Sequence, residues 1–269
     1  MEFETKVQFL TQPEHNRRTI VISDIHGHRA WLEKLLKKVD FSEKDILIIV
    51  GDMIEKGPES LNTIRCIMEL CEKYTVYPMM GNVDLWRIQM LLTEDGSLDQ
   101  ELYETNERMR QYWKATFFQD LCREAGVSVK TPEEIPAARE AVVAKFQKEL
   151  TFMKELPTIL VTPAFTFVHG GLVHEKLEDN FHLPPFQLLK NDNFINQGKH
   201  FDKYVVVGHW PVCLYRSDIE SSAPYISEEQ KIIAIDGGCG IKRDDQLNAL
   251  IIPDLYSAKA TWESVDDFP

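Results

Sequence analysis

The stretch Ile48-Ile49-Val50-Gly51-Asp52-Met53-Ile54-Glu55-Lys56-Gly57 joins an apolar run directly to a glycine and a carboxylate. The apolar run covers residues 46–50, a length that is typical of a buried strand. Open α/β sheets place their chemistry at the carboxyl ends of the strands. The stretch therefore predicts a functional carboxylate, Asp52, at a strand end.

Two neighbouring apolar runs end in the same way. Residues 19–23 lead into Asp24-Ile25-His26-Gly27, and residues 76–80 lead into Gly81-Asn82-Val83-Asp84. Three strand ends would then offer carboxylate, imidazole and amide groups, which can hold divalent metals. Because Asp52 follows the middle run, it is the residue expected to bridge two ions.

Helical periodicity separates the three predicted strands. Apolar residues recur at helical spacing over residues 31–39 and again over residues 61–71, and Pro58 is predicted to lie in the first turn of the second helix. Alternating strands and helices are the signature of right-handed βαβ units. The first part of the chain is therefore expected to form an α/β fold.

The strand signal disappears over residues 85–156, approximately, where we expect a helical insertion. Its predicted helices cover residues 85–92, about 98–124, and 139–156. Thr131-Pro132-Glu133-Glu134 resembles a capping box, and Pro136 is an alternative start for the helix that follows. The insertion could cover the strand ends, or it could be scaffold with no role in substrate choice.

Short strands return after the insertion. They are predicted at residues 158–161, 165–168, 204–207, 231–235 and 247–252. No long helices separate them, so antiparallel pairing is expected. Residues 1–18 are expected to form a short lead-in, and residues 216–230 an exposed loop.

Two of these later strands end in a histidine beside glycine. His169-Gly170-Gly171 follows one strand, and Gly208-His209 follows another. A single histidine after a strand is more often structural than a metal ligand. Five strand ends that each combine a polar residue with glycine favour a functional site.

Composition excludes several classes of partner. The chain has 269 residues and a formal net charge of −13, which argues against charge-driven binding to nucleic acid or to anionic membrane. No segment has the pattern of a signal peptide or the length of a membrane span. The five cysteines are odd in number and form no CxxC pair, so reduced thiols in the cytoplasm are expected. The oligomeric state is left open.

The motifs described above, together with Asp236-Gly237-Gly238-Cys239, stand in an order that resembles calcineurin-like metallophosphoesterases. Within that family the chain is most similar to the phosphoprotein phosphatase branch, which includes serine/threonine phosphatases and bacterial symmetrical diadenosine tetraphosphatases. The resemblance covers residues 19–252, approximately, apart from the insertion. It implies a four-layer sandwich of two mixed β-sheets flanked by helices. We expect residues 1–269 to form one such domain.

The resemblance also implies a pair of divalent metal ions, with Mn expected and Fe or Zn as alternatives. The first ion would be held by Asp24, His26 and Asp52, and the second by Asp52, Asn82, His169 and His209. Two ions about 3.5–4 Å apart would share a water molecule, lower its pKa, and hold the phosphoryl group for in-line attack by the bridging hydroxide. Asp52, Lys56 and Asn82 would form the catalytic group.

Two departures from the family pattern concern the general acid. The usual Gly-Asp-x-x-Asp-Arg-Gly motif carries Glu55 in place of its second Asp, and the usual Gly-Asn-His-Glu or Gly-Asn-His-Asp motif carries Val83 in place of its His. Glu55 has therefore lost its usual partner. General acid catalysis is worth about 10²–10⁴-fold, mostly with poor leaving groups. Either phosphoanhydrides and aryl esters are preferred, or another acid is recruited from His28, His174 or His200, although each of these three is more simply a surface residue.

The remaining departures concern phosphate binding. Lys56 replaces an arginine, which keeps the charge but loses the two-pronged contact, and a solvated turn lysine is the simpler alternative. No arginine lies between His169 and His209, which leaves Lys190, Lys199 and Lys203 as weak substitutes. Asn191-Asp192-Asn193 could line the site or form a polar turn.

Three functions follow from this pattern. The first is a metal-dependent phosphatase, similar to serine/threonine phosphatases, that acts on a phosphorylated small molecule, a nucleotide or a phosphoprotein. The second is a dinucleoside polyphosphate hydrolase, which suits the missing acid. The third is an attenuated phosphate-binding or regulatory protein that retains its metals.

Overall fold

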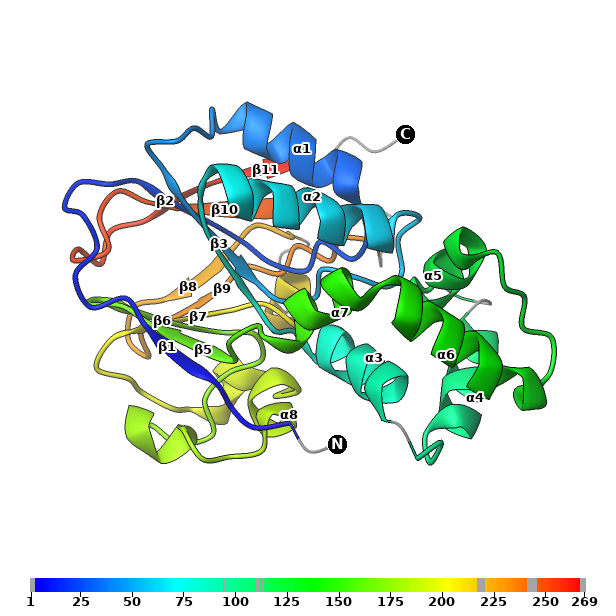
Figure 1. Cartoon of the computed structure of the whole chain (residues 1–269). Coiled ribbons are helices and arrows are strands. Elements are labelled where there is room, and N and C mark those ends of the chain that lie inside the picture. Colours follow the sequence, from blue (N-terminus) through cyan, green and yellow to red (C-terminus); the bar gives the residue numbers. More distant parts are fainter. Residues whose placement is uncertain are drawn as a thin grey trace.

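Two mixed β-sheets lie face to face at the centre of the molecule, and helices cover their outer faces (Figure 1). The computed structural model describes residues 3–93, 95–109, 112, 114–216, 221–240 and 246–266. Within these ranges the chain alternates between the two sheets in a way that brings several strand ends to one place.

The five-stranded sheet has the order β11-β10-β2-β3-β4. Its strands are β2 (Thr19–Ile22), β3 (Ile46–Val50), β4 (Thr75–Met79), β10 (Leu247–Ile252) and β11 (Thr261–Val265). Strands β2, β3 and β4 are parallel, whereas β10 is antiparallel to both β2 and β11. The three parallel strands are those predicted around Asp52, and their carboxyl ends share one edge.

The six-stranded sheet has the order β1-β5-β6-β7-β9-β8. Its strands are β1 (Val7–Phe9), β5 (Ile159–Val161), β6 (Phe165–Val168), β7 (Tyr204–Val207), β8 (Tyr225–Ser227) and β9 (Ile232–Ala234). Strands β6, β7 and β9 are mutually parallel. The expectation of antiparallel pairing holds for β5–β6, β8–β9 and β2–β10. It is wrong for β6, β7 and β9, because the 3-10 and helical turns between these strands provide the crossovers that parallel pairing needs.

Side-chain alternation along the strands creates three apolar layers. Val21 and Ile48 pack into the space between the sheets, against Phe165, Phe167 and Val206 of the opposite sheet. The residues that alternate with them in β2 and β3 point outward into the helical layer. Strands β2 and β3 are thus buried on both faces, which explains their continuous apolar sequences.

The two outer layers differ in their secondary structure: long helices cover one sheet, and a short helix with 3-10 turns covers the other. Helices α1 (Arg29–Lys38) and α2 (Ser60–Lys73) cover the five-stranded sheet, whereas α8 (Pro185–Leu189) and the 3-10 turns η2 (Leu177–Asn180), η3 (Phe194–Gln197) and η4 (Val212–Tyr215) lie on the side of the six-stranded sheet (Figure 1). Two mixed sheets flanked by helices confirm the predicted sandwich.

Because α2 begins at Ser60, Pro58 precedes the helix and the prediction that it lies in the first turn is wrong.

The helical insertion contains more helices than predicted. It comprises α3 (Asn82–Leu92), α4 (Asp99–Met109), α5 (Phe117–Ala125), η1 (Pro132–Glu134), α6 (Ile135–Lys145) and α7 (Gln147–Lys154). A single helix over 98–124 is wrong, because Thr116 starts a new helix by accepting a hydrogen bond from the Gln119 amide. A single helix over 139–156 is also wrong, because the backbone leaves helical geometry at Phe146, whose side chain is buried.

The start of the chain and the region 216–230 also contain strands that the sequence did not predict. β1 lies within the expected lead-in and pairs in parallel with β5. β8 lies within the expected loop, of which residues 217–220 fall outside the described part of the chain. Both strands are three residues long and only partly buried, so they carry little alternation for a sequence pattern to detect.

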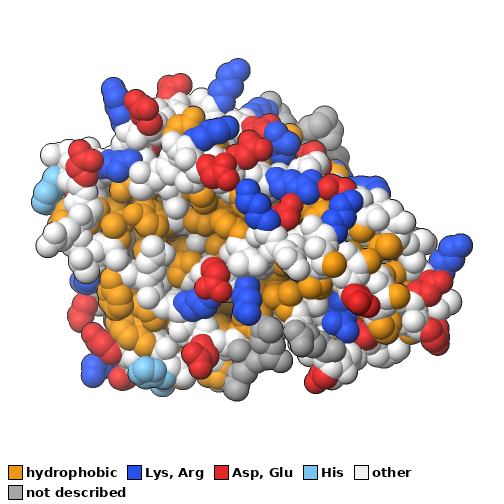
Figure 2. Space-filling model, viewed as in Figure 1, with side chains coloured by type: hydrophobic (Ala, Val, Ile, Leu, Met, Phe, Trp, Pro, Cys, Tyr) orange, Lys and Arg blue, Asp and Glu red, His pale blue; other side chains and the backbone are white. Residues whose placement is uncertain are grey.

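Charges on the face shown in Figure 2 are mixed, with lysine and arginine side chains interspersed among aspartate and glutamate. This face presents no extended basic surface of the kind that binds nucleic acid. Among the described residues, no helix combines the length and the apolar character needed to cross a membrane.

Candidate metal centre

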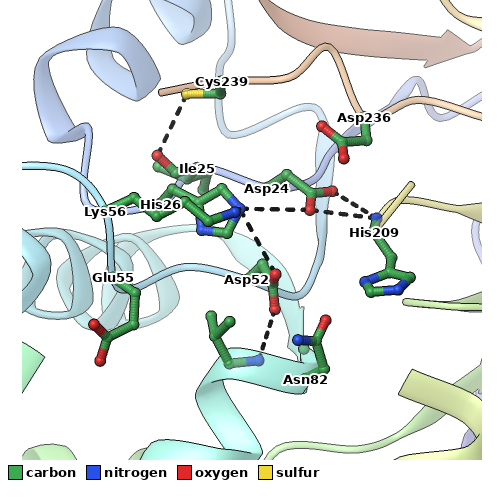
Figure 3. Close-up of polar contacts among 12 residues, drawn as sticks. Asp24, Ile25, His26, Asp52, Glu55, Lys56, Asn82, His209, Asp236 and Cys239 are labelled. Atoms are coloured by element: carbon green, nitrogen blue, oxygen red, sulfur yellow. Dashed lines mark hydrogen bonds and ion pairs between the residues drawn. The ribbon is translucent and has the colours of Figure 1, made fainter. Parts of the chain in front are cut away.

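Polar side chains from both sheets gather where their parallel strands end (Figure 3). Asp24 follows β2 and Asp52 follows β3, while Asn82 is the first residue of α3, just after β4. His169 follows β6 and His209 follows β7 of the other sheet. The two histidine loops are joined by a 2.9 Å hydrogen bond from the Gly208 amide to the His169 carbonyl. Folding thus brings the sequence-predicted residues from five strand ends into one region.

Asp24, His26 and Asp52 form the tightest group. Each offers one ligand atom, and these atoms all lie within 4.8 Å of one another, with all three residues buried. His26 Nε2 is 3.8 Å from Asp24 Oδ1 and 3.7 Å from Asp52 Oδ2. Two carboxylates and an imidazole at these separations form a donor set suited to a divalent cation.

Asp52 also belongs to a second group, through its other oxygen. Asp52 Oδ1 is 3.2 Å from His169 Nε2, and the same nitrogen is 3.0 Å from Asn82 Oδ1. The Asp52 carboxylate thus has one oxygen facing His26 and the other facing His169. This is the arrangement expected of a residue shared by two ions.

His209 lies beside both groups. Its backbone amide donates to Asp24 Oδ2 at 3.1 Å, and its ring centroid is 5.4 Å from that of His169. The ring nitrogen Nε2 is 2.6 Å from Asp192 Oδ1. His209 is therefore anchored at its main chain and at the far end of its ring.

Hydrogen bonds fix which nitrogen two of the histidines present. His26 Nδ1 lies 3.1 Å from the Ile54 carbonyl oxygen, and His169 Nδ1 lies 2.8 Å from that of Val50. A carbonyl only accepts, so each Nδ1 carries a proton, and Nε2 is the nitrogen that faces the carboxylates and is left to bind a cation. Metal-ligating histidines are held in this way, and the residues present therefore fit a metal site.

The electrostatics of the centre are those of buried carboxylates held close together. Burial, followed by the charge of Asp236, raises the pKa of Asp24 well above its usual range. Burial by itself lowers the pKa of His169, but the charges of Asp52 and Asp24 outweigh it and raise that pKa to about 10. The group thus attracts positive charge, as an anionic metal site does.

The backbone at the centre is strained. Asp24, His26, Asp52 and His209 all have left-handed backbone angles, with φ of 55°, 48°, 51° and 64°. Such angles in residues other than glycine cost roughly 1–3 kcal/mol each and occur mainly at functional sites. Four of the candidate metal ligands thus adopt backbone angles that are unfavourable for their residue types.

Two glycines allow the loops to approach this closely. A Cβ atom on Gly81 would lie 2.0 Å from the Asp52 amide nitrogen, and one on Gly208 would lie 2.2 Å from Asp24 Oδ2. Neither position has room for a side chain. The glycines that the sequence pairs with polar strand ends are therefore required by packing at the centre.

Lys56 and Glu55 extend in different directions from the loop after β3 (Figure 3). Lys56 Nζ lies 2.5 Å from His26 Nε2, at the metal-facing side of that ring. Glu55 points away from Asp52 and has a fully buried side chain. Lys56 thus brings a positive charge to the centre, as expected, whereas Glu55 does not contact it.

Glu55 has a partner that the sequence analysis did not anticipate. Its Oε1 is 2.6 Å from Arg87 Nε, and both side chains are fully buried. Glu55 thus lacks the usual histidine, which is replaced by Val83, and pairs with Arg87 instead. Arg87 lies on α3 between the apolar residues Trp86 and Ile88, and a basic residue in that setting was the available signal.

The three histidines considered as substitute acids differ in position. His28 is only 5% exposed, so its interpretation as a surface residue is wrong: its Nδ1 is 3.2 Å from the Ile25 carbonyl oxygen, and its ring stacks on Trp31. His174 and His200 are exposed, as expected.

The candidate phosphate-binding lysines are held by protein groups. Lys199 Nζ donates to the Leu172 carbonyl and Lys203 Nζ to that of Thr162. Lys190 Nζ lies 2.5 Å from Asp192 Oδ1, so Lys190 reaches the centre only through the carboxylate that contacts His209. Asp192 therefore lines the site, which was one of the two interpretations of its polar stretch.

Asp236 was given no role from the sequence, yet it lies at the centre near Asp24 (Figure 3). It follows β9, and burial raises its pKa. Its Oδ1 accepts a hydrogen bond from the Gly238 amide, and its buried Oδ2 has no hydrogen-bond partner among the described residues. The sequence carried the usual signal, an acid between a strand and a glycine pair.

Residues 17–230 match the calcineurin-like phosphoesterase family. The chain is 35% identical over 85 residues to serine/threonine-protein phosphatase 2 of Escherichia coli, which is 31% of this chain and 37% of that protein. It is 34% identical over 92 residues to a symmetrical bis(5'-nucleosyl)-tetraphosphatase of Coxiella burnetii, which is 34% of this chain and 30% of that protein. The matched segments thus span about a third of these curated relatives.

Solved structures show the same fold over nearly the whole chain. A protein described as a diadenosine tetraphosphatase superposes with a TM-score of 0.60 at 21% identity, covering 98% of this chain and 99% of that one. A serine/threonine phosphatase from Saccharomyces cerevisiae superposes with a TM-score of 0.57 at 13% identity, covering 99% of this chain and 85% of that one. With the family match over residues 17–230, these findings show that the chain belongs to the calcineurin-like phosphoesterase family.

Proposed function

We propose that this protein is a dinuclear-metal-dependent phosphoesterase that hydrolyses phosphate esters or anhydrides. The observation that carries the proposal is the position of Asp52, whose two oxygens face the nitrogens of His26 and His169 on opposite sides. A carboxylate shared by two donor groups is what a two-metal site requires. Family membership supports the same reaction class.

We assign the first metal to Asp24, His26 and Asp52, and the second to Asp52, Asn82, His169 and His209. Mn is our first choice, with Fe or Zn as alternatives, since the donors are imidazoles, carboxylates and an amide. When bound, two such ions activate water and neutralise charge on the phosphoryl group. The unpartnered oxygen of Asp236 is a further acceptor beside the first group.

The protein's own residues hold and complete this centre. The buried Asp84 carboxylate accepts hydrogen bonds from the Met53 and Gly81 amides, and so fixes the loop after β3 against the start of α3. Lys56 extends from that loop toward His26, where its ammonium group can bind a phosphoryl oxygen. We assign phosphate binding to Lys56, and catalytic roles to Asp52, Lys56 and Asn82 together.

The substrate preference follows from the residue at position 83. Val83 has no proton to donate, and Glu55 is committed to Arg87 rather than facing the centre. A leaving group that is stable as an anion needs no general acid, so we propose a preference for phosphoanhydrides and aryl phosphates over alkyl phosphates. The serine/threonine phosphatase stays the first variant, and the missing acid makes the dinucleoside polyphosphate hydrolase its specific alternative.

We also infer that residues 1–269 act as one domain, with the insertion at about 85–156 as part of it. The antiparallel bridge between Lys56 and Ala115 supports this inference, because it joins the insertion to the loop beside the centre. A cytoplasmic location is proposed from the sequence, whose five cysteines are odd in number and form no CxxC pair.

Hydrolysis of p-nitrophenyl phosphate tests the function. The protein is stripped with a chelator, reloaded with Mn²⁺ and compared with an Asp52→Asn variant treated in the same way. We expect metal-dependent release of p-nitrophenolate by the parent protein only. A panel of phosphoserine peptide, phosphotyrosine peptide and diadenosine tetraphosphate then ranks the substrates. Equal turnover by parent and variant would refute the proposal.

A further inference from the structure

Three histidines of the metal centre are held by hydrogen bonds, but one of them is held differently. His26 and His169 each engage a backbone carbonyl through Nδ1. His209 instead places Nε2 2.6 Å from the Asp192 carboxylate. The nitrogen that faces the metals must then differ as well, because a ring nitrogen that donates a proton to a carboxylate cannot also bind a metal.

The main chain of His209 indicates which nitrogen that is. Its amide donates to Asp24 Oδ2 at 3.1 Å, so the backbone side of the residue lies against the carboxylate group. In every histidine, Nδ1 lies nearer to the main chain than Nε2. Nε2 is engaged by Asp192, so Nδ1 is the ring nitrogen left to face the centre.

Asp192 is itself held in place. Its Oδ1 accepts from Lys190 Nζ at 2.5 Å, and its backbone carbonyl accepts from Gln197 Nε2 at 3.1 Å. The Asp192 side chain is 49% exposed, whereas that of His209 is 8% exposed. The carboxylate thus lies on the solvent side of the histidine, with its position set by two neighbours.

We propose that Asp192 is a positioning residue for the second metal, which it serves by accepting the Nε2 proton of His209 and directing Nδ1 toward the ion. The inference rests on the proposed two-metal function. Carboxylates that hold ligating histidines fix the ring orientation and raise ligand basicity, and their loss typically lowers metal affinity by about 10–100-fold. Lys190 has a supporting role here: it balances the charge of Asp192 and is not the substitute phosphate-binding residue.

Calorimetric titration of the chelator-stripped protein with Mn²⁺ tests the inference without measuring turnover. The parent protein is expected to bind two ions. Asp192→Ala should bind one ion as the parent does and the other about 10–100-fold more weakly. Asp192→Asn should lie between them, because an amide oxygen accepts the hydrogen bond but carries no charge. Thermal unfolding of each metal-free variant shows whether it is folded.

Two further variants separate positioning from other effects. Asp179→Ala removes a comparably exposed carboxylate that lies 3.8 Å from Lys176, and should leave both affinities unchanged. In a His209→Ala background, Asp192→Ala should cause no additional loss, because its effect passes through the missing ring.

The outcomes distinguish the inference from the function on which it rests. Failure of the parent protein to bind two ions would overturn the proposed function and the inference together. Two ions in the parent with unchanged affinities in Asp192→Ala would overturn the inference alone. An equal loss with and without His209 would also overturn it, because Asp192 would then act on the metal directly.

Discussion

Glu55 and Arg87 form a fully buried ion pair, with 2.6 Å between Glu55 Oε1 and Arg87 Nε. The pair joins the loop after β3 to the middle of α3, and both elements carry residues of the metal centre. Arg87 Nη1 and Nη2 and Glu55 Oε2 have no hydrogen-bond partner among the described residues. The two charges are therefore shielded from water, and the ion pair contributes to stability only while both residues are present.

Removing one member of this pair should destabilise the protein strongly. Glu55→Leu or Arg87→Met leaves a buried charge without its partner, which typically costs about 3–5 kcal/mol. The double variant replaces both charges with apolar groups and should be far closer to the parent in its free energy of unfolding. Urea unfolding of all four proteins measures this. Additive losses in the double variant would contradict the coupling.

Val83→His should recover little of the missing acid catalysis. Restoring the histidine alone does not restore the residue that orients it, because Glu55 points away from the centre and is paired with Arg87. We expect a gain in kcat/KM on an alkyl phosphate well below the roughly 10²–10⁴-fold of an oriented general acid. A gain within that range would show that the new imidazole is positioned without Glu55.

Gly81→Ala should abolish activity and lower stability, because its Cβ would lie 2.0 Å from the Asp52 amide nitrogen. Overpacking of this kind typically costs about 1–3 kcal/mol, and here it also moves the shared ligand. Gly126→Ala is the matched control: Gly126 ends α5 with φ of 74°, far from any clash. It should cost about 1 kcal/mol through backbone strain. Phosphatase assays should show full activity for Gly126→Ala only.

Asp45 should contribute stability that is lost in acid. Burial opposes its charge, but hydrogen bonds from Arg18 and from the Ser42 amide outweigh burial and hold the pKa of Asp45 below its usual value. A depressed pKa in the folded state stabilises the protein above the unfolded pKa of about 3.9, and this contribution disappears as pH falls through the folded value.

The variant Asp45→Asn tests this pH dependence. Its deficit in unfolding free energy relative to the parent should be constant near neutral pH and should shrink below about pH 4. Asp202→Asn, at an exposed position, serves as the control. A deficit that grows on acidification would have the wrong sign for this account.

The convergence of the candidate ligands was predictable because its signals are local. Asp24, Asp52 and Asn82 each follow an apolar strand within a few residues, and parallel pairing brings such strand ends together. The sequence order of the motifs was also specific enough to indicate the family. Asp236 carried the same local signal and could have been included.

Contacts between distant residues were not predictable in this way. Arg87 is 32 residues from Glu55, and Asp192 is 17 residues from His209, so neither pair leaves a periodic trace in the sequence. The predicted helix over residues 139–156 was also wrong, because the apolar periodicity does not show where the backbone leaves helical geometry. Phe146 continues the apolar stripe of one helix, yet its backbone departs from helical angles, so α6 ends before it and α7 begins after it.

The most direct test measures hydrolysis of p-nitrophenyl phosphate against the number of Mn²⁺ ions bound per chain. The account predicts no turnover by the stripped protein, little at one equivalent, and a plateau at two equivalents. Asp52→Asn should remain inactive at every ratio, because the ligand shared by both ions is impaired. Full turnover by the metal-free protein, or a plateau at one equivalent, would contradict a two-metal centre built on Asp52.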